Sequence, residues 1–206
     1  MSIESTIAMV RTRPDVSWEI APLLPRQGEW SESDYFWLTN RARHLIEFSS
    51  GHIEVLPMPT EEHQRILMFL YRVFYAFLSA THRALVLPAG VRVRTTPDTY
   101  REPDLVLLLS EDDPRRGNTF WEGADLVAEV VSPDDPARDL VRKRNEYAQA
   151  GIPEYWIINP HQQTITVLRL EEGQYVEHGV FVRGDEATSA LLPGLLVPVA
   201  DALDGR

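Results

Sequence analysis

The sequence predicts an α/β domain in which buried strands and antiparallel hairpins combine with amphipathic helices. Three observations predict this fold class. Two nearly continuous apolar runs, within residues 101–109 and 124–133, are typical of strands buried on both faces of a sheet. Residues 60–78 carry apolar side chains at helical spacing. Residues 164–182 alternate apolar and polar side chains around a Glu172-Gly173 turn, which predicts a hairpin.

Length and composition place the chain among globular proteins. Its 206 residues are 44% hydrophobic and 25% charged, which suits one domain with an N-terminal elaboration. We expect residues 1–30 to form an arm, because prolines and tryptophans are scattered there, and residues 31–206 to form the domain. No apolar run approaches about 18 residues and no signal pattern opens the chain, so we expect a cytoplasmic protein without a membrane partner.

Charge and cysteine usage exclude several classes of function. The absence of cysteine excludes disulfides, thiolate metal sites and cysteine nucleophiles. A net charge of −11 argues against a protein that coats nucleic acid, because phosphate binding requires clustered positive charge. It leaves room for an enzyme that meets phosphates through a divalent cation and a local arginine patch. Of the 20 basic residues other than histidine, Lys143 alone is a lysine, which draws attention to its position.

The first part of the domain contains a short helix and a hairpin. A helix over residues 33–40 can be capped by Ser31 or Ser33. Residues 44–48 and 52–56 flank Ser49-Ser50-Gly51, which predicts a pair of antiparallel strands. Glu47 and Glu54 lie on these strands, where we expect them to face solvent. In the alternative interpretation, one of them is an accessory carboxylate of a functional site.

The helix that begins after Thr60 has the strongest pattern in the chain. Thr60 can cap it, and its apolar stripe belongs to the core. His63 lies in the first turn, where a surface or capping role is the expectation. Residues 84–87 and 91–94 then predict a strand pair, or one strand with a kink at residues 88–90. Asp98 falls in a turn-rich stretch and lacks the apolar run that follows Asp104.

The second half predicts a helix between buried strands. Asp135 can cap a helix over residues 136–150 with Pro136 at its first position, and Gly151 can end it. Residues 154–158 predict another buried strand. The tail over residues 191–203 is apolar and punctuated by prolines, so we expect it along the sheet edge.

Two carboxylates accompany the apolar runs. Asp104 opens the first run and Glu129 lies inside the second. An ionised carboxylate inside a buried strand costs several kcal/mol unless a cation or hydrogen bonds compensate. A metal site formed by both residues would explain this arrangement. Alternatively, Asp104 caps a turn after Pro103 and Glu129 pairs with an arginine near a strand end.

The helix that follows Glu129 carries further candidates. Asp139, Lys143 and Tyr147 are spaced i, i+4, i+8 and share one face, so the lysine can point at the strand ends. A solvated Lys143 paired with Asp139 is the alternative. Candidates for a phosphate-facing patch, which could equally be solvated or paired with acids, are Arg92, Arg94, Arg101 and Arg142.

Several of these residues together resemble a known family. The stretches concerned are Pro103-Asp104, Glu129-Val-Val-Ser132-Pro133, Asp139, Lys143, Tyr147, Gly151-Ile-Pro-Glu-Tyr-Trp156 and Asn159-Pro160. They resemble the Uma2 family of the PD-(D/E)xK nuclease superfamily, over roughly residues 30–203. The resemblance implies a restriction-endonuclease-like fold, in which helices flank a mixed central sheet. A homodimer follows by analogy only.

The resemblance also implies a chemistry. It implies a metal-dependent endonuclease that hydrolyses phosphodiester bonds, with DNA as the nucleic-acid substrate. Asp104, Glu129 and the carbonyl of Val130 would bind Mg²⁺ or Mn²⁺, and these carboxylates with Lys143 would be catalytic. The superfamily places its lysine two residues after the glutamate, where this chain has Val131, so Lys143 is the candidate replacement. Accessory candidates are Glu47, Glu62 and Tyr147.

Two other functions remain open at this point. A catalytically inactive nuclease fold that serves as an interaction or nucleic-acid-binding module would explain Val131 and the acidic net charge. A phosphodiesterase for RNA or a small substrate would use the same metal centre and suits a chain of charge −11 better than long duplex DNA does.

Overall fold

The computed structural model describes residues 24–81, 84–132 and 138–206. Its helical segments are α3 (Glu32–Thr39), α4 (Glu61–Thr81), the π-helical segment η2 (Arg138–Lys143), α5 (Arg144–Gln149) and α6 (Val199–Asp204). Its strands are β1 (Ile46–Ser49), β2 (His52–Val55), β3 (Leu85–Pro88), β4 (Val93–Thr96), β5 (Thr99–Arg101), β6 (Leu105–Leu108), β7 (Leu126–Val130), β8 (Glu154–Asn159), β9 (Thr164–Glu171), β10 (Gln174–Val182), β11 (Glu186–Thr188) and β12 (Leu196–Pro198).

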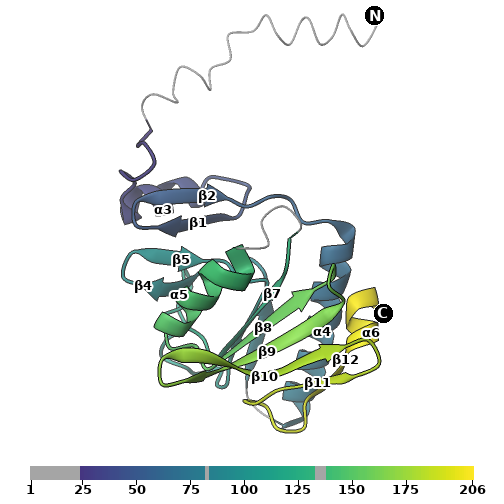
Figure 1. Ribbon diagram of the computed structural model, residues 1–206. Coiled ribbons are helices and arrows are strands. Elements are labelled where there is room, and N and C mark those ends of the chain that lie inside the picture. The colour runs from purple at the N-terminus through teal and green to yellow at the C-terminus, as the bar shows by residue number, and fades with distance from the viewer. Residues whose placement is uncertain (1–23, 82–83, 133–137) are drawn as a thin grey trace, which may run out of the picture.

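A six-stranded sheet forms the centre of the fold. Its strand order is β10-β9-β8-β7-β6-β3, and β7 and β8 are parallel while the other neighbours are antiparallel. Helices lie on both of its faces (Figure 1). The predicted mixed central sheet flanked by helices is therefore confirmed. Strands β6 and β7 are buried at every position, as their continuous apolar runs predict.

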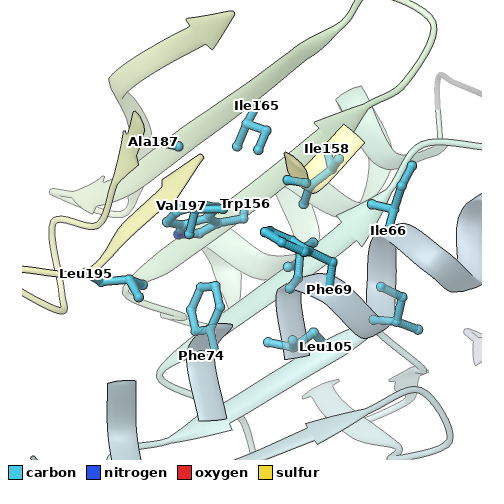
Figure 2. Close-up of a cluster of buried hydrophobic side chains, with 14 of the residues drawn as sticks. Ile66, Phe69, Phe74, Leu105, Trp156, Ile158, Ile165, Ala187, Leu195 and Val197 are labelled. Carbon is cyan, nitrogen blue, oxygen red and sulfur yellow. The ribbon is translucent and has the colours of Figure 1, made fainter. Parts of the chain in front are cut away.

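One face of this sheet is covered by α4 and α6. Alternate strand residues point to it, and the large side chains Phe74 and Trp156 pack edge to face with ring centroids 5.4 Å apart. Figure 2 shows this cluster, in which Leu195 and Val197 of the tail lie beside the side chains of α4. The tail therefore packs over a face of the sheet and not along its edge, because its apolar side chains complete the layer that α4 leaves open.

Glu154 attaches the tail to the sheet. This residue is fully buried at the start of β8. Its Oε1 accepts hydrogen bonds from Trp156 Nε1 and Ser189 Oγ, each at 2.6 Å. Its Oε2 accepts the backbone N–H groups of Ala190 and Leu191 at 2.7 and 2.8 Å. Four donors compensate the buried carboxylate, which therefore serves the structure of the tail.

The other face of the sheet is covered by α5. Tyr147 of this helix packs against Tyr155 of β8, with ring centroids 5.2 Å apart. Gly151 follows the helix with a φ of +72°, a conformation that glycine adopts without strain, which confirms its predicted role. The predicted cap at Asp135 and Pro136 lies outside the described residues. Within those residues, no helix combines the length and apolar character that crossing a bilayer requires.

A second sheet of order β2-β1-β5-β4 carries the predicted hairpin and short helix. Ser31, one of the two predicted caps, caps α3 through a capping box with Asp34. The expected pairing of residues 84–87 with residues 91–94 is wrong. Strand β3 pairs with β6 in the large sheet and β4 pairs with β5 in the small one, so the intervening Pro88–Gly90 stretch separates two sheets. The boundary between an N-terminal arm and the domain at residue 30 stays a prediction.

Candidate active site

Strand register brings Asp104 and Glu129 together. Leu105 of β6 pairs with Ala128 of β7 in antiparallel register. Asp104 precedes Leu105 and Glu129 follows Ala128, so both carboxylates reach the same end of the strand pair. Asp104 Oδ2 accepts the backbone N–H of Val130 at 2.8 Å, which links the two positions directly.

Lys143 projects from the π-helical segment toward these carboxylates. Its Nζ lies 2.8 Å from Glu129 Oε1, 3.2 Å from Glu47 Oε1 and 3.6 Å from Asp139 Oδ1. Its side chain is only 2% exposed, so the alternative of a solvated lysine is wrong. Tyr147, four residues further along, donates from its hydroxyl to Glu129 Oε1 at 2.5 Å.

The helix that carries Lys143 begins with π-helical hydrogen bonding. The segment Arg138–Lys143 is a π-helix, and ordinary α-helix follows from Arg144. Asp139 and Lys143 are buried on this segment and Val141 is exposed. Irregular π turns of this kind occur frequently at functional sites. The sequence pattern predicted a shared face for the buried residues but gave no sign of the π turn.

Glu47 is part of this constellation, which corrects the expectation that it faces solvent. It is completely buried. Alternation directs its neighbours Ile46 and Phe48 into a separate apolar cluster of the small sheet. The opposite face of β1 meets Lys143, and Glu47 Oε1 also accepts the backbone N–H of Glu102 at 3.1 Å. The contact with Lys143 thus buries the face of β1 that strand alternation alone would leave to solvent.

Arg101 supports the same carboxylate from the other side. Its guanidinium donates to both oxygens of Glu146 at 2.6 Å and to Glu47 Oε2 at 3.1 Å. Arg101 is 3% exposed, so it is unsuited to the phosphate-facing role expected for it. Its bidentate pair instead joins the small sheet to α5.

His63 contacts Asp104, which corrects its assignment to the surface. Its Nε2 lies 3.1 Å from Asp104 Oδ2, and the side chain is 18% exposed. Thr60 Oγ1 accepts the backbone N–H of His63 at 3.2 Å, so the predicted capping of α4 by Thr60 is confirmed. Burial lowers the pKa of His63, but the hydrogen bond and charge of Asp104 outweigh it, so the pKa is raised.

One cavity of about 180 Å³ is lined by His63, Asp104, Glu129, Asp139 and Lys143 together with other residues. Its lining contains both titratable and apolar residues. The titratable lining residues are Glu62, His63, Glu102, Asp104, Glu129, Arg138, Asp139, Lys143 and His161. The apolar lining residues are Leu45, Leu56, Pro57, Met58, Pro59, Ala89, Val130, Val131 and Pro160. Residues that are distant in sequence thus meet where α4 begins and β7 ends.

The charge balance of the cavity is negative. Among the described residues, five carboxylates line it against Arg138 and Lys143. Burial, with the charges of Asp104, Asp139 and Glu47, raises the pKa of Glu129, although Lys143 opposes the shift. Burial likewise raises the pKa of Glu102 to about 7. The same carboxylates raise the pKa of Lys143, which therefore carries its charge.

The donor set fits a hard divalent cation. Asp104, Glu129 and the Val130 carbonyl are oxygen donors, which Mg²⁺ and Mn²⁺ prefer. Among the described residues no group of three His, Asp or Glu side chains is arranged to hold a metal ion. Mg²⁺ nevertheless binds proteins through one or two carboxylates and completes its shell with water and substrate. Asp139 Oδ1 and Glu102 Oε2, both buried, accept no hydrogen bond from a described residue, although Lys143 Nζ and Arg138 Nε each lie 3.6 Å from Asp139 Oδ1.

The remaining candidates lie in different places. Glu62 lines the cavity from an exposed position on α4. Arg92 lies 3.4 Å from Glu102, and Arg94 donates to Glu122 at 3.1 Å. Arg142 is 49% exposed and pairs with Glu54 at 3.0 Å. A role of these arginines in binding phosphate stays a prediction.

Sequence reasoning missed Glu102 and His63 as neighbours of the predicted centre, and it named Glu47 only as an accessory candidate. Glu47 carried the same signal as Glu129, a single carboxylate between apolar residues of a strand. Glu102 is two residues before Asp104 and could have been found by proximity. His63 gave no signal in the sequence, because the contact with Asp104 spans 41 residues.

Comparisons with known proteins agree with this fold. A crystal structure from Anabaena variabilis ATCC 29413, described as "a putative nuclease belonging to DUF820", matches with a TM-score of 0.67 and 21% identity, over 80% of this chain and 92% of that chain. Among curated proteins, no sequence matches the chain. The family model Uma2, described as "Putative restriction endonuclease", matches residues 32–200. The chain therefore belongs to the Uma2 family.

Proposed function

We propose that the protein is an endonuclease that hydrolyses phosphodiester bonds in DNA and depends on Mg²⁺ or Mn²⁺. The observation that carries the proposal is the meeting of Asp104, Glu129 and Lys143 at one cavity. Membership of a family described as a restriction endonuclease supports a nuclease and favours DNA as its substrate. The acidic donor set supports a divalent cation rather than a purely protein-based site.

Each residue of the centre has a distinct role in the proposal. Asp104 and Glu129 bind the cation, with the Val130 carbonyl as a further oxygen. When bound, the cation would stabilise negative charge on the phosphodiester and lower the pKa of a water. Lys143 remains charged beside Glu129, so it can orient the attacking water and stabilise the developing negative charge. Tyr147 holds Glu129 Oε1 through its hydroxyl and leaves the second carboxylate oxygen for the cation.

In this proposal Lys143, on the helix, takes the role of the lysine that the resemblance leads us to expect at position 131. Val131, two residues after Glu129, is buried in the apolar cluster that contains Tyr147. Lys143 reaches Glu129 from the helix packed on the same face of the sheet. The ammonium group of Lys143 thus reaches Glu129, while position 131 keeps an apolar side chain in the buried cluster.

Nicking of supercoiled plasmid tests this function. We expect wild-type protein to nick the plasmid with Mg²⁺ or Mn²⁺ and to stop when EDTA removes the metal. Asp104→Ala should abolish nicking, whereas Asp98→Ala should not. Asp98 is the matched control, because it is exposed and its Oδ2 and Oδ1 accept from Ser50 and Thr96 in a turn away from the cavity.

The outcomes separate the alternatives. Nicking that survives Asp104→Ala would contradict the proposed centre. If wild-type protein leaves DNA intact but hydrolyses RNA or a small phosphodiester with the same metal and Asp104 dependence, the phosphodiesterase alternative is correct. If it hydrolyses none of these substrates but binds nucleic acid or a protein, the binding-module alternative is correct.

A further inference from the structure

Besides the Val130 N–H, Asp104 Oδ2 has a second hydrogen-bonding partner, His63, which lies at the start of α4. Thr60 caps this helix by accepting the backbone N–H of His63, which fixes the first turn. The His63 ring then reaches Asp104, with 3.1 Å between Nε2 and Oδ2. An ionised carboxylate only accepts hydrogen bonds, so the ring donates from Nε2.

Two donors therefore converge on a single oxygen of Asp104. Oδ2 accepts from the Val130 N–H at 2.8 Å and from His63 at 3.1 Å. No hydrogen bond from a described residue reaches Oδ1. With Oδ2 held from two directions, the carboxylate is fixed in rotation, and Oδ1 is the oxygen available to a ligand in the cavity that Asp104 lines.

The burial of His63 carries a cost for the stability of the fold. Its Nδ1 is buried and has no hydrogen-bond partner among the described residues. An unpaired buried polar nitrogen costs free energy that a surface or purely capping residue would avoid. The ring is thus held in a partly unfavourable environment for its contact with Asp104.

We propose that His63 is a positioning residue that orients the Asp104 carboxylate for the divalent cation. This inference rests on the proposed function, in which Asp104 is a metal ligand. Partners that hydrogen-bond to ligating groups fix their orientation, and their loss commonly weakens metal binding by about 10- to 100-fold. His63 touches neither substrate nor metal in this role.

Titration of the full-length protein with Mn²⁺ alone, without nucleic acid, tests the proposal. We expect His63→Ala to weaken Mn²⁺ binding by about 10- to 100-fold. His63→Gln should restore most of the affinity, because its side-chain amide can donate near the position of the ring nitrogen. His161→Ala is the matched control, since this exposed histidine lines the same cavity and its side chain makes no hydrogen bond or ion pair with Asp104. If His63→Ala fails to fold, His63→Met keeps bulk without a donor and should show the same loss.

A second readout separates positioning from damage to the fold. In His63→Ala the Mn²⁺ concentration for half-maximal nicking should rise, while the rate at saturating Mn²⁺ should recover toward wild type. Unchanged Mn²⁺ affinity in His63→Ala, or a His63→Gln variant no better than His63→Ala, would overturn the proposal. Mn²⁺ binding that depends on His63 in a protein that cleaves nothing would leave the inference standing and remove the nuclease function. A wild-type protein that binds no Mn²⁺ would overturn both.

Discussion

Lys143 Nζ lies 2.8 Å from Glu129 Oε1, although 14 residues separate them along the chain. Glu129 lies on strand β7, and Lys143 lies at the end of the π-helical segment η2. Asp139 and Glu47 lie on other sides of the same ammonium group, at 3.6 and 3.2 Å. One buried cation therefore compensates three carboxylates from separate elements, and four predictions follow from this network and from the carboxylate that secures the tail.

Replacement of Lys143 should damage both stability and activity. Lys143→Met keeps a similar volume but leaves Glu47, Glu129 and Asp139 without their shared cation. Breaking a buried ion pair in this way costs about 3–5 kcal/mol of unfolding free energy. Urea denaturation measures the loss, and nicking should be absent even in the folded fraction. Arg142→Met is the control, because its pair with Glu54 is half-exposed and should contribute at most about 1 kcal/mol. Equal stabilities of the two variants would contradict the prediction.

Glu47 and Glu54 are paired positions of one hairpin with different burial. Glu47→Gln removes a charge that Lys143 and Arg101 both contact in the interior, so we expect a loss of about 3 kcal/mol. Glu54→Gln affects a side chain that is 36% exposed, and its loss should stay below about 1 kcal/mol. The midpoints of urea unfolding measure the stability of the two variants, which are changed at positions that pair across the hairpin. A Glu54→Gln variant as unstable as Glu47→Gln would show that strand pairing, not charge, is responsible.

Tyr147 and Tyr155 differ in what their hydroxyls hold. Tyr147 donates to Glu129 Oε1 at 2.5 Å, and Tyr155 donates to the backbone oxygen of Asp139 at 3.0 Å. Tyr147→Phe should cost about 1.5–3 kcal/mol, because the lost bond is to a charged group, and it should slow nicking. Tyr155→Phe should cost about 1 kcal/mol and leave nicking close to wild type. Rates normalised to folded protein test the difference, which should vanish if Glu129 has no part in the reaction.

The buried carboxylate of Glu154 should matter for stability but not for cleavage. Glu154→Gln replaces an oxygen that accepts two donors with an amino group, so hydrogen bonds to the tail are lost. We expect about 2–3 kcal/mol of destabilisation and a change in tryptophan fluorescence, since Trp156 donates to this carboxylate. Glu171→Gln, on an exposed pair with Arg169, should change neither property. Loss of nicking in folded Glu154→Gln protein would mean that the tail affects the site.

Local patterns in the sequence predicted most of the elements. The apolar stripe of α4, the hairpins and the buried strands β6 and β7 follow from short-range periodicity, which depends on a few neighbouring residues. The approach of Asp104 to Glu129 followed from the expectation that their strands are neighbours. The rarity of lysine in the chain also pointed to Lys143, and in the structure Lys143 lines the same cavity as Asp104 and Glu129. The roles assigned to these residues in metal binding and catalysis stay predictions.

The errors have a common physical origin in long-range docking. Strand alternation gave Glu47 a solvent-facing side because it contains no information about the helix that packs there. The contact of His63 with Asp104 depends on how α4 approaches the large sheet, and the assignment of β3 and β4 to different sheets depends on chain direction after Gly90. The π turn at Asp139 likewise has no distinct apolar period. Contacts between elements decided each of these cases.

The buried contact of Glu47 joins the small sheet to Lys143. If the hairpin of β1 and β2 detached in a local unfolding event, Lys143 would lose one of its carboxylates, and water would enter beside Glu129. We therefore expect the hairpin and the site to unfold as one cooperative unit, whose amides exchange with solvent together. A mutation on the far side of the hairpin could thus silence the enzyme without touching the cavity.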